Sequence, residues 1–352
     1  MRISRWWNYL VPFLLGIGFC AIYIYEIPFS LAIQILGLLF ITITGTIAFG
    51  YFINDWTDIV TDKIAGKHNF ASTNSLSKNV LILIGVLIIA LLPWSFLPVN
   101  IINFPLYLFQ LFLLSAYSVF PLRLKRFPLP GVVLDALYNS VIPFGIILTT
   151  FIDFNLMQYS HLNVFLIIFV ASWAFLKGLR GILLHQVQDR KNDRKTSVTT
   201  FANKFGPLKT VNLVSRYLLK TEVILLLALI LILSIHTIRF LWLVIPLFLT
   251  HLFFRFRLWE RLQARKRELK FSFLFVLNDF YEEWLPLVFL FYLINRDYTF
   301  LILLLLHILL FYAVILKMIK KTKKDLQNSR DFLYYLGEYL LLKIFRSRVN
   351  ET

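Results

Sequence analysis

The chain has 352 residues, of which 59% are hydrophobic and 16% are charged, and its mean hydropathy is +0.74. Globular proteins are usually about 45–50% apolar and about 25% charged, so this composition excludes a soluble fold of one or two domains. The net charge of +17 would suggest a nucleic-acid partner in a soluble protein, but here its meaning depends on where the cations lie along the chain. The single cysteine, Cys20, excludes a disulfide framework.

Ten apolar segments follow one another along the chain, and several approach the ~20 residues that a membrane-spanning helix needs. They lie at 9–25, 29–53, 80–97, 101–120, 132–151, 164–184, 215–235, 240–256, 271–294 and 298–318. We therefore predict an all-α, polytopic membrane helix bundle with about ten transmembrane helices.

The loops between these segments alternate between short loops with almost no positive charge and longer basic loops. Of the 36 Lys and Arg residues, only Arg239 and Arg296 fall in the short loops. The positive-inside rule then predicts that both termini and every basic loop are cytoplasmic, which removes the nucleic-acid interpretation of the charge. We divide the chain into a transmembrane domain, 1–320, and a basic cytoplasmic tail, 321–352, whose short amphipathic helix would face lipid headgroups.

A first acidic motif, NDWTDIVTD, occupies residues 54–62 at the exit of the second segment. Helical residues four apart have Cβ atoms about 5–6 Å from each other, so Asn54, Asp58 and Asp62 would form one row with Asp55 beside it. Carboxylates this close repel one another unless a cation lies between them. Oxygen ligands without His or Cys favour Mg²⁺, which completes its coordination with water and substrate phosphates.

A second motif repeats this spacing at the exit of the sixth segment, where Asp189 and Asp193 follow Asp58 and Asp62 by 131 residues. The same shift overlays the second apolar segment on the sixth, which predicts two parallel four-helix halves, followed by a terminal hairpin. Repeats of this kind often share a site at their interface. We expect a magnesium–phosphate site at the cytoplasmic mouth, the alternative for either motif being an ordinary charged loop at a membrane face.

The two motifs resemble the aspartate-rich motifs of the UbiA superfamily of intramembrane prenyltransferases, N-D-x-x-D-x-x-x-D and D-x-x-x-D. Residues 117–126, YSVFPLRLKR, resemble the family's Y-S-x-x-P-x-x-x-K-R stretch, and Thr200-Phe201-Ala202 resembles its T-L-A stretch. The resemblance covers roughly the first 210 residues. The chain departs from the family at 67–71, which read KHNFA in place of an N-R-P run, and at Ser197, where glycine is usual. The family core has nine helices, so a tenth would be an addition.

The resemblance implies that the two four-helix halves surround a central cavity open to the bilayer. A polyprenyl diphosphate would lie in this cavity, with its diphosphate on Mg²⁺ ions that neutralise the leaving group. The metal ligands that it implies are Asp55, Asp58, Asp62, Asp189 and Asp193, of which the last four form the catalytic group, and Asn54 would assist in binding substrate. An aromatic acceptor is the commonest in the family. A non-aromatic acceptor and cyclisation of the donor remain open, and no obligate protein partner is implied.

Basic groups are expected to meet the diphosphate. Lys177 and Arg180 lie within the sixth segment, where a cation costs at least ~2.5 kcal/mol and should face the bundle interior. We predict that both contact the diphosphate, the alternative being snorkelling to the headgroups. Lys125, Tyr117 and His185 are further candidates for the substrate site, against the alternatives of a basic loop, an interfacial tyrosine and a packing histidine.

The ninth segment carries three acids within an apolar run. Asp279, Glu282 and Glu283 share one helical face with Pro286 at i, i+3, i+4 and i+7. Acids inside a span are functional candidates, so this face could bind a polar acceptor or act as its base, unless the segment is interfacial and the acids are solvated. A transporter or channel is the alternative of another class. It would place charges near mid-membrane on broken helices, whereas the paired acids here cluster at one face.

Overall fold

The computed structural model describes residues 6–154, 161–195, 199–239, 241–256 and 276–323, together with Leu274 and Gln327. Every element in this part of the chain is a helix, and helices occupy the described part of all ten apolar segments. The all-α prediction is therefore confirmed. Ser197 and the amphipathic helix predicted within the tail lie outside the described residues.

The first half contains α2 (Leu10–Ile24), α3 (Phe29–Thr57), α4 (Ile59–Ala65), η1 (Ala71–Thr73), α5 (Leu76–Leu91), η2 (Leu92–Ser95), α6 (Asn103–Ser118), η3 (Leu124–Arg126), α7 (Pro128–Ala136), η4 (Leu137–Val141) and α8 (Ile142–Phe154). The remainder contains α9 (His161–Lys195), α10 (Phe201–Phe205), α11 (Pro207–Leu213), η5 (Val214–Leu218), α12 (Leu219–His236), η6 (Leu241–Leu243), α13 (Val244–Phe256), α16 (Val276–Asp279), η7 (Phe280–Trp284), α17 (Leu285–Arg296), η8 (Tyr298–Phe300) and α18 (Leu301–Leu310).

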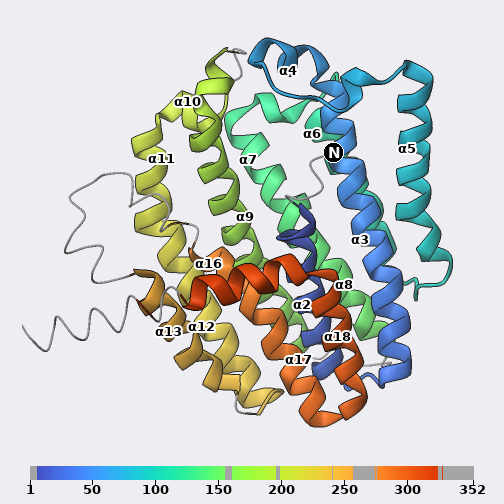
Figure 1. Cartoon of the computed structure of the whole chain (residues 1–352), viewed down its shortest axis with the longest axis vertical. Coiled ribbons are helices and arrows are strands. Elements are labelled where there is room, and N and C mark those ends of the chain that lie inside the picture. Colours follow the sequence, from blue (N-terminus) through green and yellow to red (C-terminus); the bar gives the residue numbers. More distant parts are fainter. Residues whose placement is uncertain are drawn as a thin grey trace, which may run out of the picture.

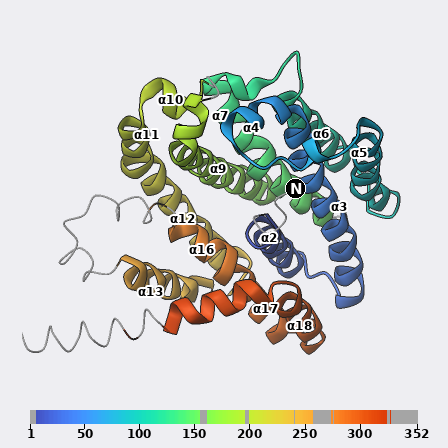
Figure 2. The same cartoon turned by 45° about the horizontal axis from the view of Figure 1, so that its top comes forward.

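Apolar residues on all sides of a helix indicate that it is buried, whereas a helix at the bundle surface meets its surroundings with one face. Every residue of α2 from Val11 to Ile22 is buried, and this helix lies within the bundle against α3, α8 and α17 (Figure 2). On α5, by contrast, Leu81, Ile84 and Ile88 are exposed, and this helix flanks α3 at the edge of the bundle. An apolar outer face of this kind fits contact with lipid tails rather than with water.

The two helices that carry the acidic motifs are longer than a bilayer requires. α3 has 29 residues and α9 has 35, so they span about 43 and about 52 Å, against a hydrocarbon core of ~30 Å. Both end on the same side of the molecule, where α4 and α10 continue them (Figure 1). The predicted parallel arrangement thus holds for the two motif helices, and it brings both motifs to one end of the bundle.

The packing of α3 against α5 depends on a glycine. A Cβ atom at Gly45 would lie 2.6 Å from the backbone N of Ala90 and 2.8 Å from its Cα. Because backbone atoms cannot move aside cheaply, we expect Gly45→Ala to lower the free energy of unfolding by about 1–3 kcal/mol. Gly37→Ala is the matched control, since it lies on the same helix with nothing within 4 Å. Thermal unfolding in detergent measures both, and equal midpoints would contradict the close α3–α5 contact.

The tenth segment is not the straight span that the sequence predicts. It consists of two helical pieces, Tyr298–Leu310 and Tyr312–Lys323, which meet at an angle of 83°. Phe311 at the bend is buried, and the carbonyl of Leu310 accepts a 3.2 Å hydrogen bond from the Trp7 indole. We call the second piece, Tyr312–Lys323, the terminal helix. It runs across the bundle rather than along it (Figure 1).

The chain is a multi-pass membrane protein, but the count of ten spans is not confirmed. Among the described residues, five helices are long and apolar enough to cross a membrane, or six if the bent pair is counted as one span. Leu10–Ile24 and Leu241–Leu252 are shorter apolar helices. The helices at Pro128–Ile152 and Pro207–His236 remain long enough to cross a membrane although each contains a π-helical turn.

Candidate active site

Both acidic motifs open onto one cavity of about 810 Å³. Four carboxylates of the motifs line it: Asp58, Asp62, Asp189 and Asp193. Farther in, its wall is apolar and aromatic, with Leu14, Leu39, Ile43, Ile146, Ile147 and Trp6. The cavity therefore has a charged mouth and apolar side chains farther in. The fold brings together two motifs that are separated by 131 residues.

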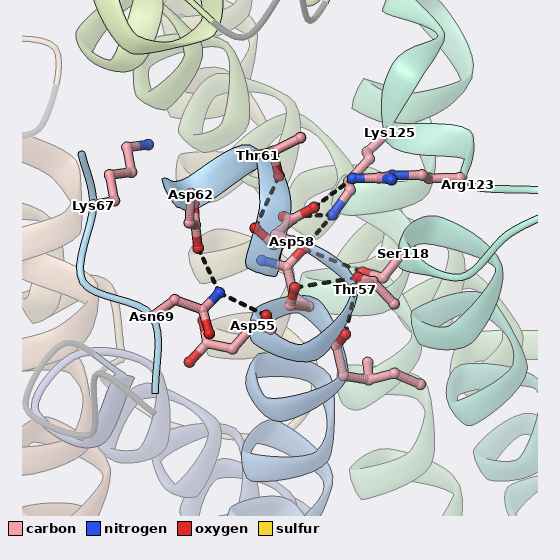
Figure 3. A network of polar contacts seen from close by, with 12 residues as sticks. Asp55, Thr57, Asp58, Thr61, Asp62, Lys67, Asn69, Ser118, Arg123 and Lys125 are labelled. Carbon is pink, nitrogen blue, oxygen red and sulfur yellow. Dashed lines mark hydrogen bonds and ion pairs between the residues drawn. The ribbon is translucent and has the colours of Figure 1, made fainter. Parts of the chain in front are cut away.

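The first motif meets two cations from the segment that follows α6. Arg123 Nη2 lies 2.7 Å from Asp58 Oδ1, and Lys125 Nζ lies 2.6 Å from Asp58 Oδ2 (Figure 3). Lys125 also donates to Asn54 Oδ1 at 2.8 Å, and Ser118 Oγ donates to the same atom at 3.2 Å. Burial lowers the pKa of the Lys125 ammonium, although Asp58 acts in the opposite direction. The structure thus brings Asn54, Asp58 and Lys125 together.

Asn69 organises the rest of this motif. Its side-chain amide donates to Asp62 Oδ2 at 2.8 Å and to the backbone carbonyl of Asp55 at 2.6 Å (Figure 3). Asp55 itself is 3% exposed and is not among the residues that line the cavity. Asp55 therefore lies apart from the four carboxylates of the cavity lining, although the sequence grouped it with them.

The second motif forms an ion pair with a lysine from the first half of the chain. Lys67 Nζ lies 3.2 Å from Asp189 Oδ2, and His185 Nδ1 lies 3.7 Å from the same oxygen. Burial raises the pKa of Asp193, and the neighbouring charge of Asp189 adds to this effect. His185 is half-exposed and lines the cavity one turn below Asp189.

The two intramembrane cations of α9 have different surroundings. Lys177 lines the cavity, with its ammonium 4.2 Å from the centre of the Phe13 ring. Arg180 is fully buried outside the cavity lining, where Nε and Nη2 bind Glu222 at 2.6 and 2.9 Å. It also donates to Asn278 Oδ1 at 2.7 Å. The structure therefore places Arg180 away from the substrate site that we predicted for it, because Glu222 and Asn278 use its donors.

The acids of the ninth segment also differ in their surroundings. Asp279 and Glu283 both bind Lys321 of the terminal helix, at 2.7 and 3.2 Å. Only Glu282 lines the cavity. The π-helix η7 changes the helical register, so Glu282 points into the cavity whereas Asp279 and Glu283 point toward Lys321. The three acids therefore do not share the single face that their spacing predicted.

Tyr117 lies on the cavity wall beside a second tyrosine, with ring centres of Tyr117 and Tyr138 5.3 Å apart. Sequence reasoning missed Lys67, Asn69, Arg123, Asp135 and Tyr138 as cavity or motif neighbours. Lys67 and Asn69 stand where the chain departs from the family pattern, which was a usable signal. Asp135 is an isolated acid within an apolar segment, a position that by itself marks a functional candidate.

The fold of this chain is similar to that of known structures. Among solved structures, that of a UbiA homolog from Archaeoglobus fulgidus matches with 20% identity and a TM-score of 0.51, covering 82% of this chain and 96% of that one. Structures of a UbiA homolog from the same organism match at 18% identity and a TM-score of 0.49 over 89% of this chain. They are bound to DMAPP and Mg²⁺, covering 96% of that chain, and to GPP and Mg²⁺, covering 97%.

No curated protein matches the chain in sequence. The model of the UbiA prenyltransferase family matches residues 9–278, which include both acidic motifs and most of the cavity wall. The chain therefore belongs to the UbiA prenyltransferase family.

Proposed function

We propose that this protein transfers a prenyl group from a polyprenyl diphosphate to an acceptor, in a reaction that depends on Mg²⁺. One observation carries the proposal: carboxylates from both halves of the chain face one cavity whose interior is apolar. The charged mouth suits a diphosphate, and the interior suits an isoprenoid chain. Orientation follows from the distribution of basic loops, which supports a mouth and both termini on the cytoplasmic side.

The acidic residues fit a magnesium site in which substrate supplies part of the coordination. Within the described residues, no group of three or more His, Cys, Asp or Glu side chains is gathered closely enough to hold a metal alone. Mg²⁺ typically takes one or two carboxylates together with water and substrate phosphates, so Asp58 with Asp62 and Asp189 with Asp193 provide a suitable donor set. The metal would supply positive charge against the leaving diphosphate.

The cations at the mouth would hold the diphosphate in position. Lys67, Arg123 and Lys125 now bind the motif carboxylates, and their donors are within reach of anything that enters between the two motifs. Charge-assisted bonds from lysine and arginine to phosphate are among the stronger polar contacts in proteins. Asn54, Tyr117 and His185 would complete the polar wall around the diphosphate and the first carbon of the prenyl group.

The interior of the cavity would shelter the prenyl chain. Lys177 lies about 18 Å along α9 from Asp189, as 12 helical residues imply, so it and Glu282 would lie along the prenyl path rather than at the diphosphate. The apolar side chains of the cavity wall would contact the prenyl chain and limit its exposure to water. We propose an aromatic acceptor on the strength of the family, with a non-aromatic acceptor or cyclisation as the other products to look for.

Removing the metal should abolish the reaction. Purified protein in detergent, given dimethylallyl, geranyl, farnesyl and geranylgeranyl diphosphate with Mg²⁺ and membrane extract, is expected to release inorganic diphosphate. EDTA should reduce this release to background, and added Mg²⁺ should restore it, because an uncompensated diphosphate is a poor leaving group. Mass spectrometry of the organic product separates transfer from cyclisation. Absence of release with every donor would overturn the proposal and favour a transporter.

A further inference from the structure

Two carboxylates on the cavity wall lie outside the two acidic motifs and form no ion pair with a described residue. They are Asp135 and Glu282, whereas Asp58 and Asp189 each have a cationic partner. Glu282 is at the same depth as Lys177, whose charge acts on it. Asp135 instead accepts a hydrogen bond from a tyrosine, Tyr138. Burying a carboxylate without such a cation costs free energy. Proteins accept this cost most often at functional sites.

The local structure fixes the Asp135 carboxylate firmly. Tyr138 OH donates to Asp135 Oδ2 at 2.7 Å. Tyr138 belongs to the π-helix η4, and its backbone carbonyl accepts a 2.9 Å hydrogen bond from Gln110 Nε2 on α6. Gly178 of α9 permits close contact on the other side, since a Cβ atom there would lie 2.8 Å from the Cα of Ala136. Helices α6 and α9 therefore hold the Asp135–Tyr138 pair from two sides.

This pair lies just below the acidic motifs. Tyr117, whose ring packs on Tyr138, interacts electrostatically with both Asp58 and Asp135. His185, one turn below Asp189, also acts on Asp135. With a diphosphate between the motifs, the first carbon of its prenyl group would lie at this level, and an acceptor that attacks that carbon would lie there too.

We propose that Asp135, oriented by Tyr138, is the base that takes the proton released by the acceptor. This inference depends on the function proposed above. As the bond between the prenyl carbon and the diphosphate oxygen breaks, the acceptor atom bonds to that carbon. The hydrogen that the acceptor loses passes as a proton to the Asp135 carboxylate and then to water. The substrate class is thus an acceptor with a removable proton, namely a phenol, an alcohol or an aromatic ring activated by a hydroxyl group.

The test compares transfer with hydrolysis of the same donor. Full-length protein is given geranyl or farnesyl diphosphate, Mg²⁺ and, as acceptors, phenol, hydroquinone, 1-naphthol or membrane extract. Asp135→Asn keeps an oxygen for Tyr138 but removes the base, so the prenylated product should fall by about 10²–10⁴-fold. In the absence of acceptor, this variant should form prenyl alcohol and release diphosphate at rates within about twofold of the wild-type rates. The reason is that water reacts with an allylic cation with little help from a base.

Two further variants make the result specific. Tyr138→Phe should give a smaller loss of transfer, again without loss of hydrolysis, because the carboxylate remains but is less well oriented. Glu26→Gln, which removes an exposed carboxylate between α2 and α3, should change neither product. A parallel fall of transfer and hydrolysis in Asp135→Asn would overturn the assignment in favour of a structural or donor-binding role.

Unchanged transfer in Asp135→Asn would also overturn it, as would a wild-type protein that ionises the donor but alkylates no acceptor. If the wild-type protein neither transfers nor hydrolyses, it is the proposed function that fails, and the two failures are therefore distinguishable.

Discussion

Asp189→Ala and Asp58→Ala are each expected to lower the Mg²⁺-dependent release of diphosphate by about 10²–10³-fold, the usual effect of removing one preorganised electrostatic group. The reason is that each carboxylate faces the mouth from a different half of the chain, so the loss of either leaves one side of the metal–diphosphate complex with a single carboxylate instead of two. Release of diphosphate from purified variants, measured at saturating geranyl diphosphate and over a range of Mg²⁺ concentrations, checks this.

Asp55→Asn provides the comparison within the same motif. Because the Asp55 side chain does not line the cavity, its loss of charge should reduce release much less than the loss of Asp58. Equal and severe loss at Asp55 and Asp58, in folded protein, would contradict the present arrangement and restore Asp55 to the metal site. Full activity of Asp189→Ala would remove the second motif from the reaction.

The buried pair of Arg180 and Glu222 is expected to give the largest effect on stability. Both side chains are fully buried, and Glu222 also accepts from Tyr281 OH at 3.0 Å. Arg180→Leu leaves Glu222 charged and unpaired, which should cost about 3–5 kcal/mol, and Glu222→Leu should cost a similar amount. The double variant should lose less than the sum, because no uncompensated charge remains. Unfolding midpoints in detergent for the four proteins give the coupling energy.

Additive losses in that cycle would show that the two residues do not depend on each other. Activity of the double variant separates the structural role from the role that the sequence suggested. If Arg180 binds only Glu222, Asn278 and the neighbouring backbone, the folded double variant should retain the affinity of the wild-type protein for the prenyl diphosphate. A large rise in KM for the prenyl diphosphate would instead return Arg180 to the substrate site. Lys177, one turn away and facing the cavity, shows that neighbouring cations of one helix can have different uses.

Local errors in the sequence interpretation have a common origin. The prediction that Asp279, Glu282 and Glu283 share one face assumed a regular α-helix, whereas η7 is a π-helix. A π-helical turn has a different number of residues per turn, so the positions that share one face change. The terminal helix then binds two of the three acids through Lys321, a partner about 40 residues away that no local pattern indicates.

The sequence by itself determined the class of the protein and the chemistry of its mouth. Long apolar runs require a membrane, and four-residue spacing places Asp58 with Asp62 and Asp189 with Asp193 regardless of how the helices pack. Only the tertiary structure decided which other charged groups face the cavity: Arg180 does not, and Asp135 does. The physical reason is that helical periodicity fixes neighbours within one helix, whereas the partner of a buried charge is chosen by contacts between helices far apart in the chain.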